Sequence, residues 1–196
     1  MKPQRNPENE ARKGTDAAAL FDELLVVLAI GGDREAADRL ARRWHPRLLR
    51  TARRLAGAPL AEAVAQDAWL GIWSGLPGLR DPSRFAPWAF GILRRRAADR
   101  LGRDIVRRNG EQSLAAELPQ VTSDASTENA FAIRQAMDAL PPAQRFAAHL
   151  FFVEGLTLGE IAQAQGVPLG TAKSRLFHAR RGLKAALADT SEGETK

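Results

Sequence analysis

The chain of 196 residues contains no cysteine. Disulfide bonds, thiolate metal sites and cysteine nucleophiles are therefore excluded, and the fold must be held together by packing. The chain also lacks the run of about 20 apolar residues that a membrane-spanning helix needs. Residues 1–15 are polar, without the apolar centre of a signal sequence. We therefore expect a protein that stays in the reducing environment of the cytoplasm and inserts into no membrane.

A further absence points to the fold class. No segment alternates apolar and polar residues over the length of a strand, whereas apolar residues recur at spacings of three and four through most of the chain. We expect an all-α protein of two small helical domains, because the polar, acidic composition between them is typical of a flexible linker. The expected segments are a disordered arm at residues 1–15, a first domain at 16–104, a linker at 105–128, a second domain at 129–188 and a disordered tail at 189–196.

The first domain is expected to contain four helices. The earliest ends at a Gly31-Gly32-Asp33 turn, and its apolar residues Leu20, Leu24, Val27 and Leu28 share one face. The second, at residues 35–55, contains Pro46, which costs about 3 kcal/mol in a helix interior and predicts a kink or break near His45. Aromatic residues at helical spacing more often form a core than a base-stacking platform, so we expect core positions for Trp44, Trp69, Trp73 and Trp88.

Residues 156–183 in the second domain have the pattern of a helix-turn-helix. Thr157 is a suitable N-cap with Glu160 as its capping-box partner, and Gly166-Val167-Pro168 form a tight turn. The helix after the turn carries apolar residues in alternating steps of three and four, which predicts a continuous buried stripe of Leu169, Ala172, Leu176, Ala179 and Leu183.

The opposite face of that helix is almost entirely cationic or hydrogen-bonding. The chain has a net charge of +6, and no acidic residue lies between Glu160 and Asp189. Such a face favours a major-groove reader over a solvated helix, which would normally mix both signs of charge. Phe177 lies off the apolar stripe, so it either packs at the rim or contacts a thymine methyl group. The candidate DNA-binding residues are Thr171, Lys173, Ser174, Arg175, Phe177, His178 and Arg181.

Several motifs carry a family resemblance. Residues 139–145, 154–157, 160–162 and 170–176 together look like the promoter-reading region four of extracytoplasmic-function sigma factors of the sigma-70 family. Residues 64–73 resemble the region-two helix that binds the clamp of the polymerase β′ subunit. Residues 85–94, with Ala97 and Asp99, are similar to the region-two helix that recognises and melts the minus-ten element.

The resemblance implies a non-enzymatic sigma factor that binds core RNA polymerase and directs promoter-specific initiation. Its implied partners are the β′ clamp, promoter DNA and an anti-sigma factor, and it implies no cofactor. The residues that would contact core polymerase are Gln66, Asp67 and Leu70. Lys173, Ser174, Phe177 and His178 would lie against bases of the minus-thirty-five element, with Arg175 and Arg181 on phosphate or in packing. The single-stranded minus-ten region would be held by the loop at residues 76–84 and by Arg94, Arg95, Arg96, Asp99, Arg100 and Arg103.

The chain departs from the family pattern at three positions. Leu60 and Ala63 stand where the family usually has acidic residues, and Arg95 where it usually has asparagine. The departures imply that docking to core polymerase relies more on Asp67 and on apolar contact.

Two other functions remain open: a free-standing helix-turn-helix regulator and a sigma-like decoy that binds an anti-sigma factor. The three histidines, His45, His149 and His178, have no paired ligand spacing, so we expect no metal site. We expect a monomer when the protein is free.

Overall fold

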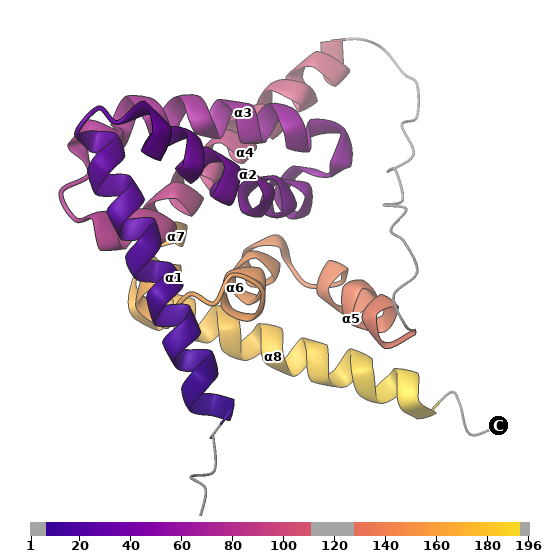
Figure 1. Ribbon diagram of the computed structural model, residues 1–196. Helices are drawn as coiled ribbons and strands as arrows, with labels where there is room; N and C mark the ends of the chain where they lie inside the picture. The colour runs from indigo at the N-terminus through magenta and orange to yellow at the C-terminus, as the bar shows by residue number, and fades with distance from the viewer. Residues whose placement is uncertain (1–6, 111–127, 193–196) are drawn as a thin grey trace, which may run out of the picture.

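The computed structural model describes residues 7–110 and 128–192. Within these two ranges every regular element is helical, as the sequence predicted. Four α-helices and two short 3₁₀ segments make up the first half, and four α-helices make up the second (Figure 1). They are α1 (Pro7–Ile30), α2 (Arg34–Ala56), α3 (Ala58–Gly75), η1 (Leu76–Gly78), η2 (Pro82–Arg84), α4 (Phe85–Gly110), α5 (Glu128–Asp138), α6 (Pro142–Phe152), α7 (Leu158–Gln165) and α8 (Leu169–Glu192).

The turn between α1 and α2 forms where the sequence placed it. Gly32 has a φ of 91°, which a residue without a side chain adopts at no steric cost. The Asp33 carboxylate then accepts hydrogen bonds from the backbone N–H groups of Glu35 and Ala36 at 2.9 and 3.1 Å. The helix that follows therefore starts with two of its free N–H groups satisfied.

Three helices extend beyond the predicted domain limits. Helix α1 begins at Pro7 rather than near residue 16, α4 continues to Gly110 into the predicted linker, and α8 runs to Glu192 into the predicted tail. Proline at a first helical position has a favourable fixed φ, and the α1 extension contains Glu8, Glu10, Ala11, Arg12 and Lys13, which propagate a helix well. The remaining parts of the predicted arm, linker and tail, at residues 1–6, 111–127 and 193–196, lie outside the described residues.

The break predicted near His45 is wrong. Helix α2 runs without interruption through Pro46. Trp44 and Leu48, on either side of the proline, are 1% and 0% exposed. Burying two large apolar side chains stabilises the helix by several kcal/mol, which offsets the cost of about 3 kcal/mol for an interior proline.

The core is built around Trp44. Its ring meets Phe85 edge-on with centroids 4.9 Å apart, and Phe90 lies 5.8 Å away. The prediction that tryptophans form the core holds for Trp44 but fails for Trp73, which is 36% exposed. The predicted common face of the first helix is also exposed, with Leu20, Leu24, Val27 and Leu28 between 40% and 66% open to solvent.

The core cluster is shared by both halves. Helix α4 packs against α7, and α2 packs against α6 (Figure 1). The largest cluster of buried apolar residues accordingly joins α1–α4 to a set from the second half: Phe146, Ala147, Leu150, Leu156, Ile161, Ala162, Ala164 and Ala172. The two predicted domains therefore form one packed body.

Candidate nucleic-acid interface

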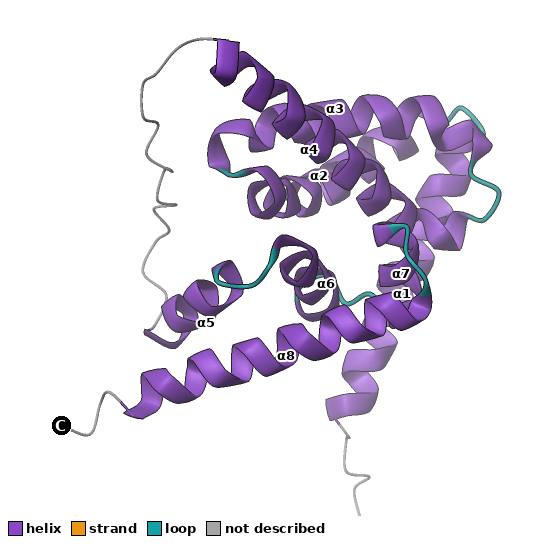
Figure 2. Ribbon diagram, turned by 180° about the vertical axis from the view of Figure 1, so that it is seen from behind, coloured by secondary structure: helices purple, strands orange, loops and turns teal. Residues whose placement is uncertain are grey.

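The predicted helix-turn-helix is confirmed in its local geometry. The Thr157 hydroxyl accepts from the backbone N–H of Glu160 at 3.3 Å, and the Glu160 carboxylate accepts from the N–H of Thr157 at 2.7 Å, which completes the capping box. Gly166 ends α7 with φ 63° and ψ 42°, the left-handed conformation that suits glycine. The cap and the turn set the angle at which α8 leaves α7 (Figure 2).

One face of α8 is buried as predicted, except at its first residue. Ala172, Leu176 and Ala179 are 3% exposed or less, and Leu183 is half-buried. Leu169 is 57% exposed, so the predicted stripe is wrong there. The residue occupies the first position of the helix, directly after the turn, where the packed face of α8 has not yet begun.

Arg175 takes a packing role. Its Nη1 donates to the Gln165 side-chain oxygen at 2.6 Å, and the Gln165 amide nitrogen donates to the Ala143 carbonyl at 3.0 Å. These bonds tie α8 to α7 and α7 to the start of α6. Of the two roles expected for Arg175, phosphate contact or packing, the geometry favours packing.

The remaining predicted reading residues lie on the open face of α8. Phe177 is 62% exposed and meets the His178 ring edge-on, with centroids 5.5 Å apart. The open face thus offers hydrogen-bond donors, positive charge and one aromatic ring. Its exposed members are Lys173, Ser174, Phe177, His178 and Arg181, and Thr171 is partly exposed beside them.

The predicted minus-ten residues on α4 are more constrained. Arg94 is partly buried, and its Nε donates to the Ala164 carbonyl of α7 at 3.3 Å. Arg100 and Arg103 place guanidinium nitrogens 3.4 and 3.8 Å from the Asp67 carboxylate. The structure therefore brings together Asp67, predicted to bind polymerase, and two arginines predicted to bind DNA.

The exposed minus-ten residues border a groove between α3 and α4. Its volume is about 360 Å³. Gly71 and Gly75 allow the close approach, because an added Cβ would lie 3.0 Å from side-chain atoms of Ile92 and Trp88 respectively. The groove has cationic, acidic and aromatic walls, formed by Gly71, Ser74, Gly75, Trp88, Ile92, Arg95, Arg96 and Asp99.

The predicted polymerase contacts on α3 form a partly apolar surface. Gln66 is exposed, and Leu70 is 70% exposed. Trp73 extends the same face one turn further on and stacks on Trp69, with centroids 5.0 Å apart and planes 22° from parallel. Trp73 was not predicted as a polymerase contact, because its helical spacing indicated a core position. Its place three residues after Leu70, a predicted polymerase contact, would have indicated the same face of the helix.

The described residues offer neither a metal site nor a membrane span. They contain no group of three or more His, Cys, Asp or Glu side chains placed to hold a metal ion. No helix among them combines the length and the apolar character needed to cross a membrane.

Together, the helix-turn-helix with its cationic open face and the arginine-bearing helix α4 define the class: a helical DNA-binding protein with two distinct cationic surfaces. Comparison with known families makes the class specific. Residues 40–104 match the family described as Sigma-70 region 2, and residues 130–183 match Sigma-70, region 4. The chain belongs to the extracytoplasmic-function sigma factors of the sigma-70 family, which are not enzymes.

Individual relatives are similar to this protein over most of its chain. The chain is 31% identical over 173 residues to the ECF RNA polymerase sigma factor SigM of Mycobacterium tuberculosis, an alignment that covers 88% of this chain and 87% of SigM. Its fold resembles the sigma factor RpoE of Bartonella quintana, solved with the anti-sigma factor NepR, at a TM-score of 0.64 and 23% identity over 77% of this chain and 96% of the other. It also resembles CnrH, solved with the cytosolic domain of CnrY, at a TM-score of 0.61 and 22% identity. That alignment covers 86% of this chain and 98% of CnrH.

Proposed function

We propose that this sigma factor directs core RNA polymerase to promoters by two surfaces, with α8 reading the minus-thirty-five element and α3 binding the β′ clamp. The observation that carries the proposal is the open face of α8, which presents exposed Lys173, Ser174, Phe177, His178 and Arg181 after a capped helix-turn-helix. Lys, Ser and His can donate hydrogen bonds to base edges or phosphates, and the Phe177 ring suits a thymine methyl group.

The reading helix is tested by transcription in a reconstituted assay with core polymerase. The double variant Lys173→Ala, His178→Ala is expected to abolish selection of the promoter while leaving association with core polymerase unchanged. Arg42→Ala, which removes one exposed positive charge from α2, serves as the control and is expected to transcribe normally. Unchanged transcription by the double variant would overturn the assignment of α8.

The polymerase contact is tested separately on α3. Leu70→Ala is expected to weaken co-purification with core polymerase, because it removes a side chain that is 70% exposed on the predicted contact face. Leu24→Ala removes an equally large side chain that is 51% exposed on α1, and is expected to leave co-purification unchanged. Tight duplex binding by the isolated chain, with no core association, would favour a free-standing regulator instead.

We also infer an anti-sigma partner, on the evidence of a groove of about 760 Å³ where α5, α6 and α8 meet α2. The apolar part of its lining is made by Ile133, Met137, Phe152, Val153 and Leu183. The polar part is cationic apart from His149, and the lining residues include no acid. The cations are Arg50, Arg54, Arg134, Arg180 and Lys184.

The occupant that fits this groove is an amphipathic helix with one apolar face and flanking acidic residues. A synthetic helix of that pattern is expected to bind the full chain. Phe152→Asp is expected to weaken this binding at least tenfold, because it places a negative charge among the apolar lining residues. Equal binding by a helix with lysines in place of the acids would overturn the inferred chemistry. Binding of the partner without any transcription by the chain would indicate the decoy function.

The proposed function carries two further expectations. Its place of action is the cytoplasm, where core polymerase and promoter DNA are found. The free chain is expected to be a monomer, which light scattering would check.

A further inference from the structure

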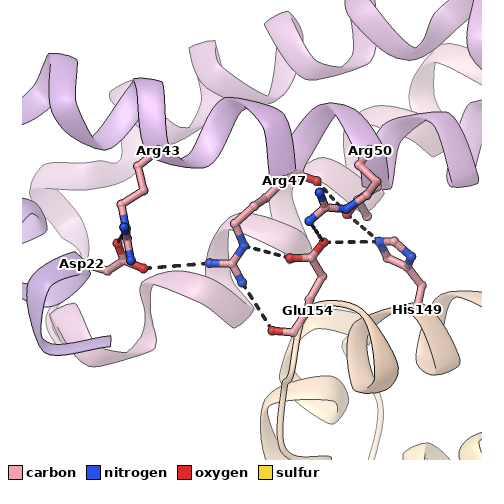
Figure 3. Close-up of polar contacts among 7 residues, drawn as sticks. Asp22, Arg43, Arg47, Arg50, His149 and Glu154 are labelled. Atoms are coloured by element: carbon pink, nitrogen blue, oxygen red, sulfur yellow. Dashed lines mark hydrogen bonds and ion pairs between the residues drawn. The ribbon is translucent and has the colours of Figure 1, made fainter. Parts of the chain in front are cut away.

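A buried polar cluster joins the two halves of the molecule. Glu154, between α6 and α7, accepts hydrogen bonds from Arg47 Nε and Arg50 Nη2 of α2, both at 2.8 Å (Figure 3). Its side chain is only 1% exposed. Arg47 also donates to the Glu154 backbone carbonyl at 3.4 Å. We call Arg47, Arg50, Thr51, His149 and Glu154 the hub.

A second bond in the hub crosses the same boundary. The Thr51 hydroxyl donates to the Arg47 carbonyl at 2.9 Å, which leaves its oxygen to accept from His149 Nε2, also at 2.9 Å. The same His149 nitrogen lies 3.5 Å from the Glu154 carboxylate. Both Thr51 and His149 are buried, at 0% and 2% exposure. The centre of the hub, made by Thr51, His149 and Glu154, is therefore buried at the boundary, whereas the side chains of Arg47 and Arg50 are 27% and 47% exposed.

The Arg47 side chain is also held by contacts with residues of its own half, the first. Its guanidinium lies 4.0 Å from the centroid of the Trp44 ring, and its Nη1 lies 3.9 Å from the Asp22 carboxylate of α1. Asp22 in turn pairs with Arg43. The donor is thus preorganised, so closing the two halves requires little further ordering of its side chain.

The charge state of Glu154 follows from this setting. Burial acts to raise the pKa of the carboxyl group, but the hydrogen bonds from His149, Arg47 and Arg50 outweigh it and lower the pKa from 4.5 to about 2. Glu154 is therefore ionised throughout the physiological range, and it depends on partners from α2. A further ion pair across the boundary, Arg54 with Asp138, has side chains 30% and 51% exposed, where solvent screens the attraction.

The closed arrangement covers part of a predicted DNA-binding surface. Arg94 of α4 is bonded to the Ala164 carbonyl of α7, and a Cβ at Gly91 would lie 3.5 Å from the same oxygen, so the two helices are in van der Waals contact (Figure 2). The minus-ten and minus-thirty-five elements lie about 25 base pairs apart, or about 85 Å of duplex at 3.4 Å per pair. Helix α4 in contact with α7 cannot serve one element while α8 serves the other.

We propose that the Glu154 hub is an autoinhibitory latch: it holds the free chain closed, with α7 over the Arg94 face of α4, and it must be broken before both promoter elements can be read. The contacts above support the closed arrangement. Its consequence for promoter reading rests on the proposed function of α8 and on the predicted minus-ten role of α4, so the test separates the closure from that consequence.

The absence of cysteine makes the latch directly measurable. Two exposed alanines, Ala58 on α3 and Ala185 on α8, are replaced by cysteine in the full chain and carry spin labels, whose separation is measured by pulsed electron resonance. Glu154→Gln keeps the shape of the side chain but removes its charge, and is expected to raise the ratio of open to closed chains by about 100-fold, because the two arginines lose a buried partner. Glu35→Gln breaks the Arg39 pair wholly within α2 and is the control, with no change expected.

Arg50→Ala provides a second variant should Glu154→Gln fail to fold. It leaves the Arg47 bond intact, and is expected to raise the open fraction by about tenfold. An unchanged label distance in a folded variant, or an open wild-type chain, overturns the latch. The same proteins are titrated with a single-stranded minus-ten oligonucleotide, which open chains are expected to bind at least tenfold more tightly. A longer label distance with unchanged oligonucleotide affinity upholds the latch and refutes the minus-ten role of α4.

Discussion

Helices α8 and α4 both carry rows of cationic side chains, but the two rows differ in which cations already have partners inside the protein. On α8, Lys173, His178 and Arg181 stand open to solvent. On α4, Arg94 is bonded to a carbonyl of α7, and Arg100 and Arg103 lie beside the Asp67 carboxylate. Positive charge alone therefore does not identify a surface that is ready to bind DNA; the contacts already made by each cation decide it.

The same contrast bears on the rearrangement that the proposed function requires. Under that proposal, Lys173, His178 and Arg181 of α8 meet the duplex from positions that are already open to solvent. Under the predicted minus-ten role, Arg94, Arg100 and Arg103 of α4 would exchange partners inside the protein for partners on DNA. We therefore expect substitutions to act on binding at α8, and on both stability and binding in the first half.

The largest effect is expected from a pair of aromatic substitutions, one on each side of the comparison. Trp44→Ala should lower the free energy of unfolding by about 3–5 kcal/mol, because it empties a site that is 1% exposed. Phe177→Ala should change it by less than about 0.5 kcal/mol, because that ring is 62% exposed. Urea unfolding followed by circular dichroism measures both. Equal losses in the two variants would contradict the contrast between a ring buried in the shared core and a ring on the open face of α8.

The next effect is a pH dependence that belongs to the boundary between the two halves. Because the folded pKa of Glu154 is lowered from 4.5 to about 2, its contribution is fully present above pH 4.5 and is lost as the pH falls toward 2. The shift corresponds to about 3 kcal/mol. Unfolding of the wild-type chain and of Glu154→Gln at matched pH should differ most near pH 6 and converge near pH 2. His149, Arg47 and Arg50 face residue 154 in both proteins, so the comparison isolates the ionisation of Glu154. A constant difference across that range would be inconsistent with the hub.

A smaller effect is expected at the free face. Lys173→Ala should weaken promoter binding by the complex with core polymerase by about 1–3 kcal/mol, because an exposed lysine near the start of α8 loses its contact with a base or phosphate. The free energy of unfolding should stay the same. Binding is measured by fluorescence anisotropy at fixed salt, with Arg42→Ala as the control. A loss of stability equal to the loss of affinity would mean that this residue, too, is engaged.

The smallest effect tests whether the two halves unfold together. Thr157→Ala removes the cap of α7 and should cost about 1 kcal/mol. All four tryptophans lie at positions 44–88, in the first half, so their fluorescence reports on a half that does not contain the substitution. The fluorescence and circular dichroism midpoints should shift by the same amount. Separate midpoints would show that the shared core does not couple the halves.

The parts of the fold that follow from short-range chemistry were predictable. The capping box joins residues three apart, and the turn at Gly166 has a local glycine signal, so the helix-turn-helix could be identified from the sequence. The hub could not, since Arg47 and Glu154 are 107 residues apart and neither sits in a periodic pattern. The burial of Asp22 could not be predicted either, because it depends on an ion pair with Arg43 of the next helix.

Local preference also misled where packing decided the outcome. Pro46 predicted a break that the burial of Trp44 and Leu48 overrides. Trp73 has the spacing of a core residue but lies at the surface, on the face predicted to bind polymerase. Leu169 belongs to the apolar pattern of α8 but precedes the part of that helix that is packed. In each case the deciding fact is which element lies opposite, and that is a property of the tertiary structure.

The core shared by α1–α4 and by α6–α8 has a consequence for how such chains can change over evolution. Two halves joined only by a linker could be exchanged among relatives like independent parts. Here Leu150, Ile161 and Ala164 complete a cluster that includes Trp44 and Phe90. A chimera that took its second half from a relative would have to match the shape of that cluster as well as the promoter sequence, so the two halves are under selection to change together.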